Sequence, residues 1–129
     1  MRVYKTKWVG RFTRREGVRD RDLAEAVRRA GLALIDADLG GGIIKQRVAR
    51  AGQGRSGGYR MLLAYRKRHR AVFLYGFAKS ERENIGDDEL QTLREIGAVW
   101  LAADARRIAE AIEENALQEV PNGEEDKKP

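Results

Sequence analysis

The order of hydrophobic and polar residues predicts a short strand and a short helix at the start of the chain. Residues 1–5 favour the strand. Trp8 and Phe12 are four residues apart, which places both on one face of a helix. Gly17 is predicted to end this helix, because glycine adopts the left-handed backbone conformation of a helix end without strain.

A second helix is predicted to follow, with Asp20 or Asp22 as its cap. Its hydrophobic residues recur at helical spacing and are expected to pack against a sheet. They are Leu23, Val27, Ala30 and Leu34. The three glycines at 40–42 are predicted to end this helix and to begin the sheet.

Three strands are predicted next, near residues 43–50, 58–67 and 70–78. A glycine-rich segment connects the first two, and the Lys-Arg-His sequence at 67–69 fits a tight hairpin turn between the second and third. The third strand is apolar on both faces, which is typical of a strand in the middle of a sheet.

Two further helices are predicted after the strands. Asp87 and Asp88 open the first, which carries Leu90, Leu93, Ile96, Gly97 and Leu101. Asp104 starts the second, which carries Ile108, Ile112 and Ala116.

These elements together predict an α+β fold in one domain over residues 1–120. An antiparallel meander sheet is expected, with the N-terminal helices packed on one face, C-terminal helices after the sheet, and the basic residues on the face opposite the N-terminal helices. Residues 121–129 are short and charged, and are predicted to form a disordered tail.

Composition narrows the class of protein. The 129 residues suit one domain, and the lack of cysteine excludes a disulfide framework and a thiolate metal site. No apolar run approaches the roughly 20 residues that span a bilayer, and Arg2, Lys5 and Lys7 are followed by no apolar stretch of a signal peptide. A cytoplasmic protein is therefore expected.

The charge is unevenly distributed along the chain. The net charge is +6, and the segment from Glu113 to the end carries six acidic residues against two lysines, so residues 1–112 carry +10. A basic body with an acidic tail favours an anionic partner such as nucleic acid.

Basic residues alternate along the predicted strands. Lys45 and Arg47 are two residues apart, so their side chains are expected on one face, roughly 7 Å from each other. Arg60 and Arg66 share a face of the next strand, with apolar residues between them. Cations fixed on a rigid sheet suit the binding of a polyanion.

Three sequence blocks carry a resemblance to a known family. They are Gly-Gly-Gly-Ile-Ile-Lys-Gln-Arg-Val-Ala-Arg from Gly40, Gly-Gln-Gly-Arg-Ser-Gly-Gly-Tyr-Arg from Gly52, and Tyr-Gly-Phe-Ala-Lys-Ser-Glu-Arg-Glu-Asn-Ile from Tyr75. In this order and spacing, they resemble the RelE/HigB toxins of bacterial type II toxin–antitoxin systems, in the RelE/ParE superfamily. The resemblance is closest over residues 40–85.

The resemblance implies an endoribonuclease that cleaves mRNA, usually on the ribosome, without a cofactor or metal. It also implies an antitoxin partner, expected to be a helix-turn-helix DNA-binding protein, and no membrane. The residues that it assigns to catalysis are Lys45, Arg47, Arg60 and Lys79. Further RNA contacts are expected from Arg50, Arg55, Arg66 and Arg82.

The residue types fit this chemistry. In-line attack by the RNA 2′-hydroxyl needs a base, stabilisation of charge on the phosphorane and protonation of the 5′-oxygen, and fixed cations can supply the charge stabilisation. Like charge favours the neutral form of a lysine, so Lys45 beside Arg47 and Arg60 is a candidate base.

The sequence departs from the family pattern after the last strand of the meander. Ser80 stands where an arginine is expected, and Ile85 and Gly86 stand near the expected tyrosine. Lys79 or Arg82 is the candidate for the leaving-group role.

Other interpretations stay open at this point. A nucleic-acid-binding module without catalysis and a ParE-like gyrase inhibitor share the fold, although Lys45, Arg47 and Arg60 argue against the inhibitor. The single histidine, His69, is expected on the surface in a turn, which excludes a ribonuclease with two histidines. For an antitoxin helix, Leu62 and Ala64 are expected to offer apolar contact area beside the cations.

Overall fold

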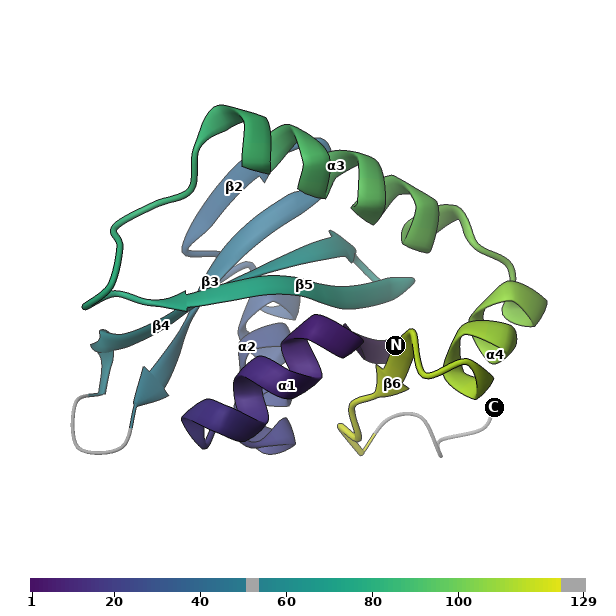
Figure 1. Ribbon diagram of the computed structural model, residues 1–129, viewed down its shortest axis with the longest axis horizontal. Helices are drawn as coiled ribbons and strands as arrows, with labels where there is room; N and C mark the ends of the chain where they lie inside the picture. Colours follow the sequence, from purple (N-terminus) through teal and green to yellow (C-terminus); the bar gives the residue numbers. More distant parts are fainter. Residues whose placement is uncertain (51–53, 124–129) are drawn as a thin grey trace.

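A mixed sheet forms the centre of the molecule in the computed structural model, which describes residues 1–50 and 54–123, and the side chains outside 51–56 (Figure 1). Within these residues the strand order is β2-β3-β4-β5-β1-β6. The strands are β1 (Arg2–Thr6), β2 (Ala37–Gly40), β3 (Ile43–Arg50), β4 (Gly54–Arg66), β5 (Arg70–Ala78) and β6 (Leu117–Glu119). Only the β1–β5 pair among them is parallel.

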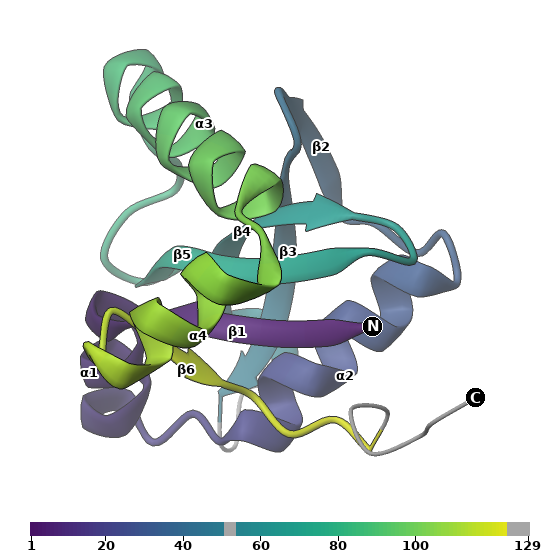
Figure 2. The ribbon, with the colours of Figure 1, turned by 90° about the vertical axis from the view of Figure 1, so that its right-hand side faces the viewer.

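Helices cover both faces of the sheet. In Figures 1 and 2, α1 (Lys7–Glu16) and α2 (Asp20–Gly31) lie on one face, while α3 (Asp87–Ala102) and α4 (Ala105–Glu113) lie on the other. The expected α+β class, with the N-terminal helices on one face, is confirmed. The expectation of an open basic face is wrong in part, because α3 crosses one end of that face.

Two hydrophobic cores follow from this layering. Leu23, Val27 and Phe73 belong to the core beneath α1 and α2. Leu62, Ala64 and further residues from α3 and α4 form the second core on the opposite face. Because successive strand residues alternate between faces, β4 and β5 supply both cores, as the apolar character of the third predicted strand indicated.

The local signals for the first two helices are mostly confirmed. Gly17 ends α1 with φ of 74°, and Thr6 caps its start by accepting a hydrogen bond from the Val9 N–H at 3.3 Å. At the start of α2 the cap residue is Arg19, and Asp22 accepts from its backbone N–H at 2.8 Å. The aspartate therefore contributes to the cap from inside the helix.

The predicted burial of Leu34 is wrong. The helix α2 ends at Gly31, and Ala33 adopts a positive φ of 64°. Leu34 consequently lies beyond the helix and is 58% exposed. The hydrophobic spacing continues for about one turn beyond the end of the helix. The low helix propensity of glycine explains why α2 ends at Gly31.

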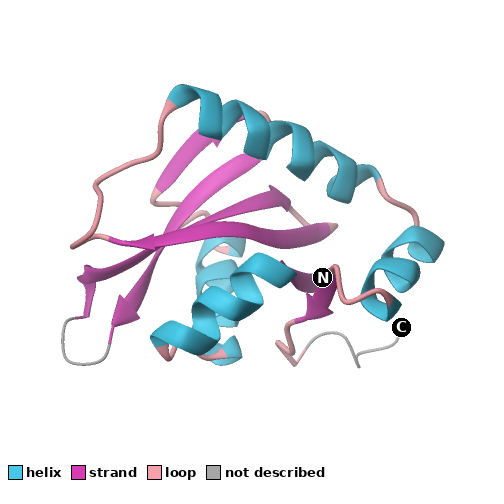
Figure 3. Ribbon diagram, in the orientation of Figure 1, coloured by secondary structure: helices cyan, strands magenta, loops and turns pink. Residues whose placement is uncertain are grey.

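The sheet is larger than the three strands predicted in its centre. Strands β3 and β5 have the predicted bounds, while β4 begins at Gly54 instead of near residue 58. The glycines at 40–42 form the turn between β2 and β3 and do not end a helix. Strand β2 was missed because four residues with one aspartate and one glycine have no strand pattern, and β6 has only three residues. Figure 3 shows both short strands at the margins of the sheet.

Close contacts fix α3 across the sheet. A Cβ atom at Gly97 would lie 3.0 Å from both the Ala64 Cβ and the Ile43 Cδ1, so a larger residue would push the helix away. The guanidinium of Arg94 donates to the carbonyls of Leu39 at 2.5 Å and Gly40 at 3.3 Å. The helix therefore stays over the end of the sheet where β2 turns into β3.

The remaining expectations concern the membrane and the tail. In the described part of the chain, the longest helix has 16 residues, and none is long and apolar enough to cross a membrane. Asn122 donates to the Met1 carbonyl at 3.1 Å, which brings the two ends of the described chain together. The predicted disorder of the tail concerns mainly residues 124–129, which lie outside the described residues.

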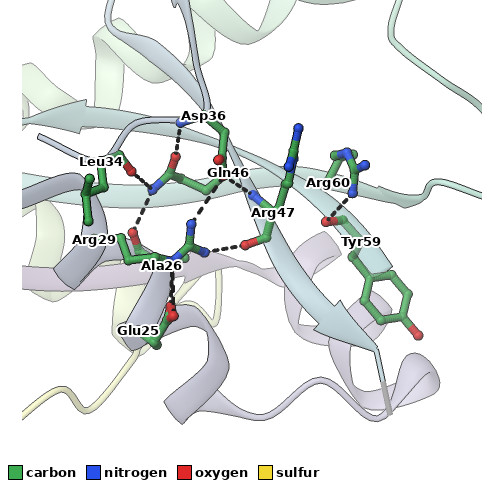
Figure 4. Close-up of polar contacts among 9 residues, drawn as sticks. All are labelled: Glu25, Ala26, Arg29, Leu34, Asp36, Gln46, Arg47, Tyr59 and Arg60. Carbon is green, nitrogen blue, oxygen red and sulfur yellow. Dashed lines mark hydrogen bonds and ion pairs between the residues drawn. The ribbon is translucent and has the colours of Figure 1, made fainter. Parts of the chain in front are cut away.

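Gln46 connects the sheet to α2 and to the segment that follows it. Its side chain is fully buried. The Nε2 atom donates to the carbonyls of Ala26 at 2.9 Å and Leu34 at 3.2 Å, and Oε1 accepts from the Asp36 N–H at 2.7 Å (Figure 4). One side chain thus contacts α2 through Ala26 and the segment between α2 and β2 through Leu34 and Asp36.

Replacing Gln46 with leucine should lower the free energy of unfolding by about 1–3 kcal/mol, because the three hydrogen bonds of its buried amide are lost. Chemical denaturation measures this change. Gln91→Leu is the matched control, since Gln91 is exposed on α3, and should change stability by less than about 0.5 kcal/mol. Equal stability of the two variants would contradict the anchoring role of Gln46.

Candidate nucleic-acid interface

Two arginines face each other across adjacent strands. The register pairs Arg47 of β3 with Arg60 of β4, and pairs Arg60 with Phe77 of β5. Directly paired residues of antiparallel strands project from the same face, with Cβ atoms roughly 5 Å apart. Figure 4 shows the Arg47 and Arg60 side chains pointing to the same side, while Tyr59 points to the other.

Lys45 lies in the next row on the same face. It pairs with Leu62, which in turn pairs with Tyr75. From the strand spacing, the Cα atoms of Lys45 and Arg60 are roughly 8 Å apart. The structure therefore brings Lys45, Arg47 and Arg60 together on one patch of the sheet, beyond the part that α3 covers.

The Arg60 guanidinium is an unusual group for its position. Arg60 is only 8% exposed, and its Nη1 atom lies 3.5 Å from the Tyr59 carbonyl. Burial lowers the pKa of Arg60, the like charge of Arg47 lowers it further, and Asp36 opposes both. Like charges directly opposite each other destabilise a sheet, so an anion bound between the two arginines would relieve this cost.

Side chains complete the edge of β3 beside Arg47. Strand β2 pairs with β3 only as far as Lys45. Beyond it, the Arg47 N–H donates to the Asp36 Oδ2 at 2.7 Å, and the Arg29 guanidinium donates to the Arg47 carbonyl (Figure 4). Arg29 also pairs with Asp36 at 3.3 Å and with Glu25 at 2.8 Å. This clamp replaces the missing strand and fixes the backbone from which the Arg47 side chain projects.

Arg82 reaches the same face from the segment after β5. Its guanidinium carbon lies 5.6 Å from the centre of the Phe77 ring, a cation–π contact. It pairs with both oxygens of Glu89, at 2.7 and 3.2 Å, and lies 3.4 Å from the Tyr75 hydroxyl. The hydrogen bond with Glu89 raises the pKa of Arg82. Arg82 is therefore held in place by the start of α3.

Lys79 stands where β5 ends, and its residue is exposed. Its backbone N–H donates to the Gly58 carbonyl at 3.0 Å, two residues from Arg60 along β4. Lys79 thus extends the β4–β5 ladder beyond Arg60. We refer to Lys45, Arg47, Arg60 and Lys79 together as the cationic patch.

The other predicted RNA contacts are dispersed. Arg50 lies 5.6 Å above the Tyr59 ring, on the face opposite Arg60. Arg66 shares the face of Arg60, but six residues of strand separate them by roughly 20 Å. The side chain of Arg55 lies outside the described residues.

The aromatic residues of β5 are mainly core residues, as expected. Phe73 is buried beneath α1 and Phe77 lies beneath the guanidinium of Arg82. Tyr75 is partly exposed, and the centre of its ring lies 4.6 Å from the centre of the Trp8 ring. His69 is exposed, as predicted, but one ring nitrogen also contacts the Leu101 carbonyl at 3.1 Å.

The apolar contact area predicted for an antitoxin helix is absent from this face. Leu62 and Ala64 are both fully buried in the core beneath α3. The prediction failed because alternation gives the face of a strand residue but does not show which helix covers it.

Several residues of the site were not predicted. Glu89 follows Gly86 by three residues and accepts from its N–H at 2.9 Å, so the spacing of a capping box was its only signal. Asp36 and Arg29 act on the Arg47 backbone from another element, and no pattern in the sequence indicates such a contact.

Comparison with protein-family models gives a match. The model of the family described as the RelE toxin of the RelE/RelB toxin–antitoxin system matches residues 1–120. The matched range includes every strand and helix described above and all residues of the cationic patch. No curated protein matches the sequence.

Replacing Asp36 with alanine should loosen β3 at Arg47, because the Arg47 N–H loses its acceptor. We expect faster hydrogen exchange at the Arg47 amide and a loss of about 1–3 kcal/mol in the free energy of unfolding. Asp38→Ala is the matched control, since this exposed aspartate accepts the nearby Gly40 N–H and does not contact the Arg47 N–H. Unchanged exchange at Arg47 in the Asp36 variant would contradict the clamp.

Glu89 should titrate below the ordinary range of a glutamate, because hydrogen bonds from Arg82 and then from the Gly86 N–H lower its pKa. A lowered pKa in the folded state stabilises the protein above the unfolded value, about 4.3, and this contribution disappears as pH falls through the folded value. Carboxylate NMR should show the Glu89 pKa rising in Arg82→Gln and staying unchanged in Lys79→Gln. A normal Glu89 pKa in the unmodified protein would contradict the pairing.

Proposed function

Since this chain belongs to the RelE toxin family, we propose that it is an endoribonuclease that cleaves mRNA on the ribosome. The observation that carries this proposal is the Arg47–Arg60 pair, two cations that face each other on one sheet face with Lys45 in the next row. A phosphate between the arginines would accept hydrogen bonds from both guanidinium groups.

Lys45 and the two arginines serve the first half of the reaction. Lys45 is the proposed general base, which accepts the proton of the RNA 2′-hydroxyl. The 2′-oxygen then forms a bond to phosphorus, and Arg47 and Arg60 stabilise the negative charge that builds up on the phosphorane oxygens. The low exposure of Arg60 favours this role, because charge stabilisation is stronger where water is excluded.

Lys79 serves the second half. As the bond from phosphorus to the 5′-oxygen breaks, the Lys79 ammonium gives its proton to that oxygen, which leaves a 2′,3′-cyclic phosphate and a 5′-hydroxyl. The Glu89 pair and the Phe77 ring hold Arg82, and it binds the RNA backbone without donating a proton. Lys79 is exposed and its ladder contact lies two residues from Arg60.

The remaining arginines do not continue the row of Lys45, Arg47 and Arg60, and we propose that they attract the RNA backbone outside the cleaved phosphate. Arg66 lies on the same face farther along β4, and Arg50 and Arg55 belong to the β3–β4 hairpin. Each phosphate contact that they make should add slightly less than one to the slope of log affinity against log salt.

The proposed function also implies an antitoxin partner and a cellular compartment. A toxin of this family has an antitoxin partner, and we propose a helix-turn-helix DNA-binding protein for it. The proposed substrate is mRNA on the ribosome, so we also propose that the protein acts in the cytoplasm.

Replacing Arg60 with alanine should lower the rate of mRNA cleavage by roughly 100-fold or more, because one fixed charge is lost from the transition state. Purified ribosomes, a defined mRNA and primer extension measure the rate. Arg66→Ala is the matched control, since it removes the same charge from the same face roughly 20 Å away, and should retain most activity.

Three results would contradict the proposal. Cleavage by Arg60→Ala at the original rate would remove the arginine pair from the chemistry. Equal losses in the Arg60 and Arg66 variants would mean that the cations only attract RNA. Binding of RNA without any cleavage by the unmodified protein would favour a nucleic-acid-binding module on the same fold.

A further inference from the structure

A run of four apolar residues is exposed between α2 and β2. Leu32, Ala33, Leu34 and Ile35 follow one another, and the three large side chains are 67%, 58% and 37% exposed. The left-handed conformation of Ala33 interrupts the helix here, so the run does not fold back onto the core. Consecutive exposed apolar residues are unusual on a monomeric surface and mark interaction sites.

Two adjoining cavities lie beside this run. The first has a volume of about 510 Å³, with lining residues that include Val27, Gly31 and Leu32. The second has a volume of about 480 Å³, with Ile35 in its lining. Both are also lined by Tyr65 and Lys67, so they adjoin each other at the C-terminal end of α2, and the two together are called the groove here.

The groove contains a polar group that lacks a partner. The Tyr65 hydroxyl is buried and makes no hydrogen bond to any described residue. Burial also raises the pKa of Tyr65, so the hydroxyl stays protonated and able to donate. A buried polar group without a partner is costly, and a polar atom of a bound molecule would satisfy it.

The rim of the groove is positively charged. Arg28, Lys67 and Arg68 line the first cavity. Within residues 1–50 and 57–123, no carboxylate forms an ion pair with any of the three. The second cavity includes one acidic residue, Asp38, whose Oδ1 accepts the Gly40 N–H. The groove therefore complements a ligand with apolar and acidic groups.

We propose that this groove binds the antitoxin, through a segment with at least two large apolar side chains and neighbouring acidic residues. The proposal depends on the proposed function only for the identity of the partner. Leu32 and Ile35, which line the cavities, and the adjoining exposed Leu34 supply the apolar contact. The Tyr65 hydroxyl donates to a polar atom of the segment, and Arg28, Lys67 and Arg68 pair with its acidic side chains. The buried Leu62 and Ala64 cannot serve this purpose.

Other occupants fit the groove less well. RNA would use the cations but would leave the exposed leucines without apolar contacts. A second copy of this chain would bring a second cationic rim against the first. The chain's own last six residues, Glu-Glu-Asp-Lys-Lys-Pro, include no large apolar side chain to cover the leucines.

The test uses the full chain and, as the probe, the purified protein encoded by the reading frame next to its own. Calorimetry compares the unmodified toxin with the double variant Leu32→Glu, Leu34→Glu. Affinity should fall about 100-fold or more, because each buried leucine is worth roughly a tenfold change or more. Ile96→Glu, Val99→Glu is the matched control on exposed α3 residues, and its affinity should change less than threefold.

A second variant and a second measurement separate the alternatives. Lys67→Glu should weaken binding at low salt and much less at high salt, since it reverses one charge on the rim. Unchanged affinity of the Leu32, Leu34 variant would overturn the proposal. So would a dimer of the toxin alone that this variant converts to monomer in analytical ultracentrifugation. Cleavage of mRNA by the same variant reports separately on the proposed function.

Discussion

The pairing of Arg47 with Arg60 places two like charges at cross-strand distance, with Arg47 exposed and Arg60 mostly buried. The like charge of Arg47 acts on Arg60, and the backbone beneath the two residues is held from several directions. On the outer side of β3, Asp36 and Arg29 take the place of a neighbouring strand. On the inner face, Gln46 ties the same strand to α2. On the far side of Arg60, Phe77 separates it from Arg82, whose charge Glu89 balances. An anion bound between the two guanidinium groups would offset their like charge.

The helix α3 divides the sheet face that carries Arg47 and Arg60 into a covered apolar part and an uncovered cationic part. Gly97 allows α3 to lie directly on Ala64 and Ile43, which closes one end of the face. The rows that begin with Lys45 and Arg47 lie beyond that contact, where Arg82 and the start of α3 approach from the side. The apolar rows thus stabilise the fold, and α3 does not cover the adjoining cationic rows. The second exposed feature, the apolar run after α2, lies near the other end of β4, so the proposed catalytic site and the proposed antitoxin groove are separate surfaces.

The sequence predicted the parts of this account that depend on alternation. Lys45 and Arg47 share a face because they are two residues apart, and the turn at 67–69 fixes how β4 meets β5. What escaped prediction depends on contacts between elements. Asp36 receives the Arg47 N–H only because β2 ends early, and Glu89 reaches Arg82 only because the segment after β5 returns to the sheet. Leu34 fits the helical pattern, yet Gly31 ends the helix before it. Leu34 instead belongs to the exposed apolar run of residues 32–35.

The central claim is that the cations act on a phosphate attacked by the neighbouring 2′-hydroxyl. The most direct measurement uses a ribosome-bound mRNA with a single 2′-deoxy nucleotide on the 5′ side of a known cleavage position. Cleavage at that position should disappear, cleavage elsewhere in the same molecule should persist, and the unmodified mRNA should yield 2′,3′-cyclic phosphate and 5′-hydroxyl ends. Cleavage at the 2′-deoxy position would contradict the claim, because the attacking group would then come from outside the RNA.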